Sequence, residues 1–156
     1  IVMEKNEINL SINIEDTRWN NAFEDFQAYS FDVVTTCFKV CKKSINPNME
    51  LNIILVNDNY IQKINKDYRG KDKPTNVISF ETGDKFLLGD IFISYDTLTC
   101  EANGQNISFK DHYTHLLCHG VLHILGFDHI NDEDAEIMES LEIKILRKFK
   151  IENPYK

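Results

Sequence analysis

The sequence lacks long hydrophobic runs and linker-like segments. No apolar stretch approaches the roughly 18 consecutive residues of a membrane-spanning helix, and Ile1–Lys5 has no signal-peptide pattern. The 3 prolines and 6 glycines form no linker, and the chain shows neither repeats nor a low-complexity tract. With 156 residues, of which 42% are hydrophobic, it is long enough to bury a core. We therefore expect one cytoplasmic domain over residues 1–156, without membrane contact.

The sequence also lacks a C-x-x-C pair among its 4 cysteines. In a cytosolic chain such isolated cysteines are expected to be reduced, partly buried thiols rather than disulfides. Cys118 adjoins His119, which would suit a nucleophile and its base. Consecutive helical side chains point about 100° apart, however, so this pattern disfavours a Cys–His catalytic pair.

A positive net charge is missing as well. The 17 lysines and arginines against 25 aspartates and glutamates give a net charge of −8, so the whole chain exerts no general attraction on nucleic acid. Residues 63–73 are locally basic, and they form either a solvated face or a phosphate-binding patch. The basic members of this run are Lys63, Lys66, Arg69, Lys71 and Lys73.

Acidic residues gather at the start of the last expected helix. Negative side chains there complement the positive end of the helix dipole, which is a sufficient reason for their position. They are Asp132, Glu133, Asp134, Glu136, Glu139 and Glu142.

Three of the 5 histidines lie within the segment 119–129. His119 and His123 are four residues apart, so on a helix they share a face and lie about 6 Å apart along the axis. Gly126 can end that helix with a positive φ and let the chain return to present His129. Three imidazoles leave the fourth position of a zinc ion open for water, as in catalytic sites. We therefore predict one zinc ion per chain, bound by His119, His123 and His129.

Two further histidines complicate the choice of ligands. His112 and His115 fall on the same helical stripe, but His115 and His123 are about 12 Å apart along the axis, too far to bind one ion together. A second possible ligand set is therefore His115 and His119 with a remote residue. The prediction we favour is that His112 and His115 are hydrogen-bonded core residues.

The histidine segment resembles the metzincin zinc motif H-E-x-x-H-x-x-G-x-x-H. Gly120 stands where that motif has its general-base glutamate, so peptide hydrolysis by the metzincin mechanism is disfavoured. The glycine variant, H-G-x-L-H-x-x-G-x-D-H, resembles the signature of the YbeY family. Residues 68–80 (YRGKDKPTNVISF) resemble the second hallmark of that family, and residues 88–94 resemble the strand that follows it.

This resemblance covers residues 50–150 and departs from the family at two positions. Many members have Asp at the position of Asn76 and Pro at that of Glu81. The resemblance implies a metal-dependent, single-strand-specific endoribonuclease that acts in ribosomal RNA maturation, at the 3′ end of the small-subunit RNA, and in ribosome quality control. It also implies single-stranded and ribosomal RNA, small-subunit proteins and an assembly GTPase as partners, and no DNA.

Two other functions fit the same motifs. One is a metal-stabilised ribosome-assembly factor without essential catalysis, and the other is a metallohydrolase of a non-nucleic substrate. For RNA cleavage, the nucleophile is either the 2′-OH or a metal-bound water. The resemblance places Arg69 in the cleft as a catalytic residue, where its planar fork would bind phosphate oxygens. Asp128 either orients a histidine ligand or caps the local turn.

Hydrophobic periodicity predicts the α+β class, with a four-stranded mixed sheet and helices packed against it, and the motif resemblance implies that one of these is a metzincin-like metal-binding helix. The last helix has an apolar residue every four positions from Ile137 to Phe149, which predicts a buried face. The expected strands are 7–14, 50–56, 76–81 and 87–94. The expected helices are 20–44, 58–67, 96–105, 109–125 and 132–149. The first choices for core residues are Phe80, Phe92, Leu122, Leu125 and Leu141.

Overall fold

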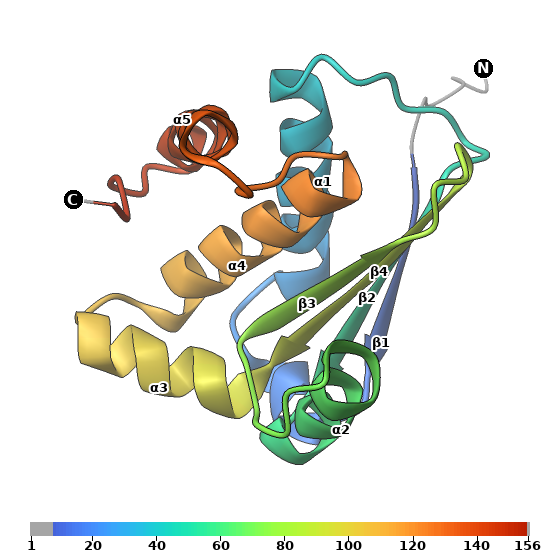
Figure 1. Ribbon diagram of the computed structural model, residues 1–156. Helices are drawn as coiled ribbons and strands as arrows, with labels where there is room; N and C mark the ends of the chain where they lie inside the picture. The colour runs from blue at the N-terminus through green and yellow to red at the C-terminus, as the bar shows by residue number, and fades with distance from the viewer. Residues whose placement is uncertain (1–7, 156) are drawn as a thin grey trace, which may run out of the picture.

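The computed structural model describes residues 8–155, which form four strands, five α-helices and one 3-10 helix (Figure 1). The strands are β1 (Asn9–Ile14), β2 (Glu50–Val56), β3 (Val77–Glu81) and β4 (Leu87–Ser94). The helices are η1 (Thr17–Asn21), α1 (Phe26–Val40), α2 (Asp58–Arg69), α3 (Tyr95–Gln105), α4 (Phe109–Ile124) and α5 (Asp132–Lys148). Within this part of the chain, no helix combines the length and the apolar character needed to cross a membrane.

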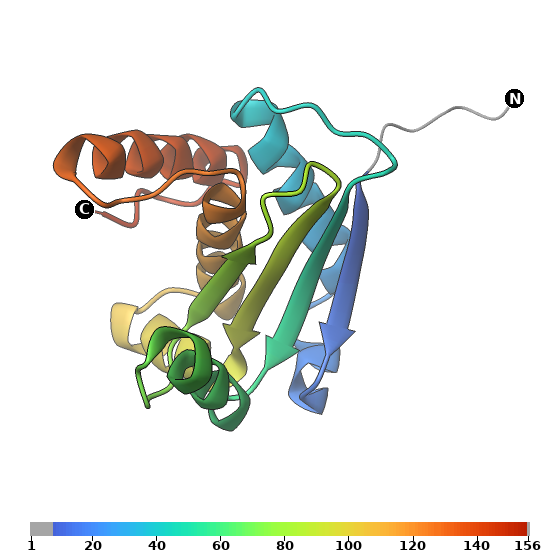
Figure 2. The ribbon, with the colours of Figure 1, turned by 45° about the vertical axis from the view of Figure 1, so that its right-hand side comes forward.

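The strands form one mixed sheet in the order β1-β2-β4-β3 (Figure 2). β1 and β4 both run parallel to β2, whereas β3 pairs antiparallel with β4 at one edge. Parallel neighbours need a long crossover, and α1 supplies it between β1 and β2. The predicted α+β class with a four-stranded mixed sheet is therefore confirmed. The first residue of the predicted strand 7–14 lies outside the described residues.

The main core lies between one face of the sheet and helices α1 and α4. Inward residues of the two central strands, such as Ile53 and Ile91, are fully buried there. A smaller apolar cluster of Val56, Ile61 and Ile78 lies under α2 on the other face. Among the expected core residues only Leu122 is fully buried, whereas Leu125 and Leu141 pack at the edge of the main core and Phe80 and Phe92 flank the smaller cluster.

Two predicted helical details are wrong. The helix expected over residues 20–44 is interrupted, because Asp25 has a φ of 56° and separates η1 from α1. In α5, Ile137 is 48% exposed and Met138 is buried in its place. The other positions of the four-residue repeat, Leu141, Ile145 and Phe149, do pack in or against the main core, so the buried face differs from the prediction only in the first turns of α5.

Gly120 lets α4 lie very close to the sheet. A Cβ atom at this position would be 2.8 Å from Cγ2 of Ile91 and 3.1 Å from Oγ of Ser79. The same Ser79 hydroxyl donates a hydrogen bond of 3.2 Å to the Gly120 carbonyl. The position of the metzincin glutamate is thus filled by the sheet itself, and a glutamate would not fit there unless α4 moved away.

Replacement of Gly120 by alanine tests this close approach. Alanine improves helix propensity by about 1 kcal/mol, but overpacking against Ile91 costs about 1 to 3 kcal/mol. We expect Gly120→Ala to lose up to about 2 kcal/mol of unfolding free energy in urea titrations. Gly104, in α3, has no atom within 4 Å of a built Cβ, so Gly104→Ala should be stabilising. Equal stabilisation by both variants would contradict the packing argument.

Candidate metal centre and cleft

Helix α4 and the turn that follows it bring three histidines together. His119 and His123 lie one turn apart near the end of α4, and their Nε2 atoms are 3.0 Å apart. Gly126 has a φ of 98°, which confirms the predicted turn, and the chain then returns with His129. The nearest ring nitrogens of all three lie within 4.8 Å of one another. The cluster could therefore hold one metal ion.

The donor set of this cluster fits a zinc-type ion. Two nitrogens bound to a tetrahedral ion at about 2.0 to 2.1 Å are about 3.3 Å apart, close to the spacing of the His119 and His123 Nε2 atoms. Burial, followed by the nearby His119, lowers the pKa of His123 and favours the neutral imidazole that binds metal. His129 is exposed, so one side of the cluster is open to solvent.

A buried carboxylate holds the first of these histidines in place. Glu142, in α5, is fully buried, and its Oε1 accepts a hydrogen bond of 2.6 Å from Nδ1 of His119. Its Oε2 accepts one of 3.0 Å from Nε2 of His115 and another from the Tyr155 hydroxyl. Because Nδ1 of His119 donates to Glu142, its Nε2 points towards the other two histidines. Carboxylates orient metal-binding histidines in the same way in other proteins.

Glu142 is ionised in spite of its burial. Burial alone would raise its pKa, but the hydrogen bonds from His115 and His119 outweigh this effect and lower the pKa to about 2. In the sequence, Glu142 is grouped with the acidic residues that open the last helix, and this role was therefore not predicted. A signal was available, since Glu142 lies four residues after Met138 and three before Ile145 on the buried face of α5.

The two remaining histidines each make a hydrogen bond, as predicted, but only His112 is a core residue, whereas His115 is partly exposed. His115 bonds Glu142, and His112 is buried with its Nε2 2.8 Å from Oε1 of Glu101. The Glu101 carboxylate also accepts a 3.0 Å hydrogen bond from the side-chain amide of Asn76, directly before β3. An ionised aspartate at position 76 could not donate this hydrogen bond. The asparagine of this chain is therefore explained by its contact with Glu101.

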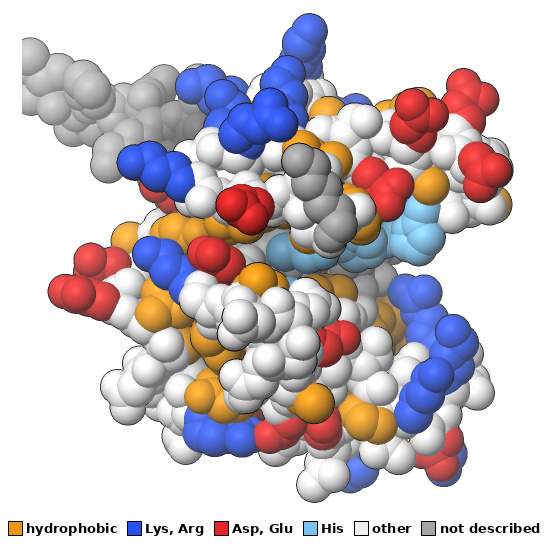
Figure 3. All heavy atoms as spheres, turned by 90° about the vertical axis from the view of Figure 1, so that its left-hand side faces the viewer, with side chains coloured by type: hydrophobic (Ala, Val, Ile, Leu, Met, Phe, Trp, Pro, Cys, Tyr) orange, Lys and Arg blue, Asp and Glu red, His pale blue; other side chains and the backbone are white. Residues whose placement is uncertain are grey.

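The histidines open into a cleft of about 750 Å³. One wall is formed by β3, and another by the C-terminal end of α2 and the loop after it, including Arg69, Lys71 and Lys73. Figure 3 shows histidine side chains in this hollow, with basic side chains along one border and acidic ones along the other. Folding thus brings part of the basic run beside the histidine cluster, although about fifty residues separate them in sequence. Lys63 and Lys66 do not line the cleft.

Arg69 is the last residue of α2 and is anchored to the cleft wall. Its Nη2 donates a hydrogen bond of 2.8 Å to the Ser79 carbonyl, and its guanidinium carbon lies 5.3 Å from the centre of the Phe80 ring. These two contacts fix the plane of the guanidinium and leave other N–H groups for a ligand.

Two other predicted residues have local structural roles. Asp128 accepts a 2.7 Å hydrogen bond from the backbone N–H of His129, but its Oδ1 lies 3.9 Å from Nδ1 of that histidine. It therefore caps the turn and makes no hydrogen bond to the His129 ring. Cys118 is fully buried, and a hydrogen bond with Cys37 together with burial raises its pKa well above the usual value, so it is no nucleophile. All four cysteines are free, as predicted.

The α+β fold places a three-histidine cluster beside a basic wall in one cleft. This arrangement is typical of metal-dependent enzymes that act on phosphate-bearing substrates. Comparison with known proteins is more specific. The family described as "Endoribonuclease YbeY" matches residues 11–150. The chain belongs to the YbeY endoribonuclease family.

Individual relatives agree with this assignment. The chain is 47% identical over 137 residues to endoribonuclease YbeY of Colwellia psychrerythraea, covering 85% of this chain and 86% of that protein. It is 43% identical over 140 residues to endoribonuclease YbeY of Ruthia magnifica, covering 86% and 97%. The solution structure of TM1509 from Thermotoga maritima has a TM-score of 0.58 at 20% identity and covers 90% of this chain and 91% of that one. This last likeness concerns the fold alone.

Metal content tests the three-histidine cluster. We expect about one zinc-type ion per chain, and the separate replacement of His119, His123 or His129 by alanine should remove most of it, because two imidazoles hold the ion much less tightly. His112→Ala is the matched control, since His112 lies on the same helix but bonds Glu101. Elemental analysis after dialysis checks this. Equal metal loss from all four variants would refute the ligand assignment.

Metal affinity tests the role of Glu142. Glu142→Gln keeps the shape of the side chain but removes the charge that orients His119, so metal affinity should fall about 10- to 100-fold. Competition with a chelator of known affinity measures this change. Glu136→Gln, which removes an exposed carboxylate from the same helix, should leave the affinity unchanged. Unchanged metal binding in Glu142→Gln would show that the carboxylate serves only to join α5 to α4.

Proposed function

We propose that this chain is a zinc-dependent endoribonuclease that cleaves single-stranded RNA in the cleft between α2, β3 and the end of α4. The main support is that one cleft contains both the three-histidine cluster and Arg69 with Lys71 and Lys73. Such a cleft binds a negatively charged backbone beside a metal ion, although the whole chain carries a net charge of −8. Family membership supports RNA rather than another phosphate ester as the substrate.

The residues of the cleft have separate roles in this reaction. A bound zinc ion supplies positive charge that polarises a phosphate oxygen and lowers the pKa of water. Arg69, fixed by Ser79 and Phe80, binds the phosphate oxygens on which negative charge increases in the transition state. Lys71 and Lys73 bind the neighbouring phosphates. Glu142 keeps His119 oriented towards the metal.

The position of Gly120 separates this reaction from peptide hydrolysis. In metzincins the residue after the first histidine is the glutamate that accepts a proton from water. Here β4 and Ser79 fill that space, so this proton acceptor is absent. The nucleophile in RNA cleavage, either the 2′-OH or water, still has to lose a proton. Water acidified by a bound metal ion, or a histidine, would accept that proton in place of a glutamate at position 120.

In the cell, we propose a role in maturation of the small-subunit ribosomal RNA 3′ end and in ribosome quality control, with small-subunit proteins and an assembly GTPase as partners.

Replacement of Arg69 by lysine separates catalysis from metal binding. Lysine keeps the charge but loses the planar fork, so RNA cleavage should fall roughly ten- to a thousandfold, the scale of losing about 1.4 to 4 kcal/mol of transition-state stabilisation. Metal content and circular dichroism should stay normal. Single-turnover cleavage of a single-stranded RNA by metal-loaded protein measures the effect.

Lys63→Ala is the control for this experiment, because Lys63 lies on the same helix outside the cleft. Its cleavage rate should match that of the wild type. A wild-type rate in fully metal-loaded Arg69→Ala would refute the catalytic role of Arg69 and favour an assembly factor that does not depend on cleavage.

A further inference from the structure

Tyr68 is a large aromatic side chain that the fold leaves in solvent. It is 69% exposed, although it directly precedes the anchored Arg69 at the end of α2. Its ring centre lies 5.4 Å from that of Phe80 at an angle of 67°, and Phe80 lines the cleft. Tyr68 itself does not line the cleft, but this contact holds its ring beside two residues that do, Arg69 and Phe80, while most of its surface remains free.

Packing within the chain explains Tyr68 poorly. Tyr60, on the same helix, is 39% exposed and stacks on Phe92, with ring centres 6.2 Å apart. Tyr68, in contrast, contacts one ring only, that of Phe80, in an edge arrangement that buries little of its surface. The ring of Tyr68 therefore remains available to stack on a ligand with a flat apolar face.

The surroundings of Tyr68 indicate which ligand this is. Arg69, Lys71 and Lys73 line the cleft beside it, and proteins that bind single-stranded nucleic acids combine such a basic groove with aromatic rings on which bases stack. Across the cleft lie Asp128 and the acidic start of α5, which repel phosphates. The RNA backbone would therefore follow the basic α2 side, next to the exposed Tyr68 ring.

We propose that Tyr68 is a stacking platform for an unpaired base next to the phosphate that Arg69 binds. The proposal rests on the proposed function and adds a source of strand selectivity. A base in a duplex is already stacked on its neighbours and cannot reach the ring, whereas a base in a single strand can. Every base has an aromatic face, so the platform selects single strands with little regard to sequence.

Binding of matched oligonucleotides tests this platform. Dissociation constants of metal-loaded protein are measured by fluorescence anisotropy at one salt concentration, for a single-stranded RNA and for an abasic strand of equal length and charge. Wild type should bind the base-bearing strand more tightly. Tyr68→Ala should weaken that binding about five- to a hundredfold, the range for one stacked base, and should leave binding of the abasic strand unchanged.

Two further variants separate stacking from loss of structure. Tyr68→Phe keeps the aromatic face and should retain binding, and Tyr60→Ala should bind both strands as wild type does. In Tyr68→Trp, the exposed indole fluorescence should be quenched by the base-bearing strand and not by the abasic one, whereas Trp19 is fully buried and should not respond. Circular dichroism and metal content should match wild type in all variants.

The outcomes distinguish this proposal from the proposed function. If wild type cleaves RNA but Tyr68→Ala keeps the wild-type ratio of affinities for the two strands, the stacking platform is refuted and the nuclease remains. A wild type that binds both strands equally refutes it as well. If metal-loaded wild type binds the base-bearing strand through Tyr68 but does not cleave it, the stacking proposal is supported and the catalytic function fails.

Discussion

The close packing of α4 on the sheet is the constraint on which the site depends. Gly120 has no side chain where Ile91 and Ser79 approach the helix, so α4 lies directly on β3 and β4. This contact fixes the rotation of the helix about its axis, and the histidines one residue before and three residues after Gly120 are turned towards the cleft. The same contact occupies the space of a metzincin-type glutamate. One glycine thus decides both where the ligands point and which proton acceptor is absent.

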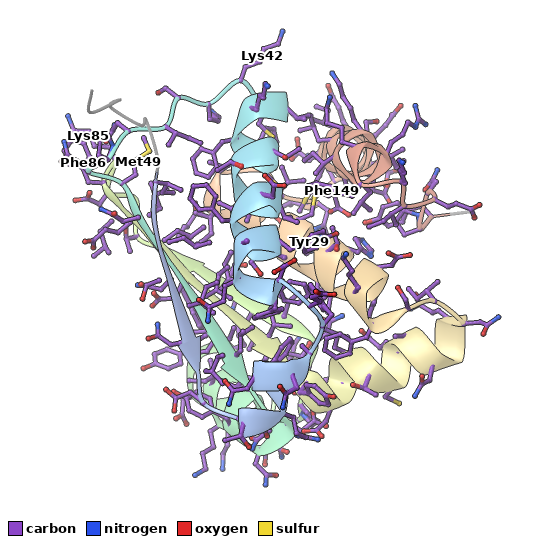
Figure 4. The ribbon with its side chains drawn as sticks, turned by 180° about the vertical axis from the view of Figure 1, so that it is seen from behind. Tyr29, Lys42, Met49, Lys85, Phe86 and Phe149 are labelled. Atoms are coloured by element: carbon purple, nitrogen blue, oxygen red, sulfur yellow. The ribbon has the colours of Figure 1, made fainter. Side chains whose placement is uncertain are left out.

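A second layer of contacts holds α4 from its other side. Glu142 is a buried charge, and a buried charge is stable only when its hydrogen-bonding capacity is filled. His115, His119 and Tyr155 fill it, so α5 and the C-terminal segment are joined to α4 at the cluster. In the view from behind, Phe149 after α5 lies against Tyr29 of α1, where their ring centres are 5.5 Å apart (Figure 4). The orientation of His119 therefore depends on how α5 packs against α1 and α4.

The electrostatics of the molecule are local rather than global. A net charge of −8 does not favour nucleic acid, and yet Arg69, Lys71 and Lys73 lie on one wall of the cleft. Because exposed charges are screened within about 10 Å at ordinary ionic strength, nearby basic residues matter more to a bound phosphate than distant acidic ones. The acidic first turn of α5 would repel phosphates and so favour a backbone path along the α2 side.

Local patterns in the sequence were sufficient for the strands, for most helix limits, for the turn at Gly126 and for the spacing of His119 and His123, because these depend on neighbours within a few residues. They were insufficient wherever distant segments decide. The break at Asp25, the burial of Met138 instead of Ile137 and the partnership of Glu142 with His119 all follow from packing between elements. Whether Arg69 faces the histidines was equally a matter of tertiary structure, since only the pairing of β3 with β4 beside α2 brings residues fifty positions apart into one cleft. The sequence by itself determined the spacing of the three histidines and the helix that carries two of them, and the tertiary structure decided what surrounds them, because contacts between distant segments have no local signature.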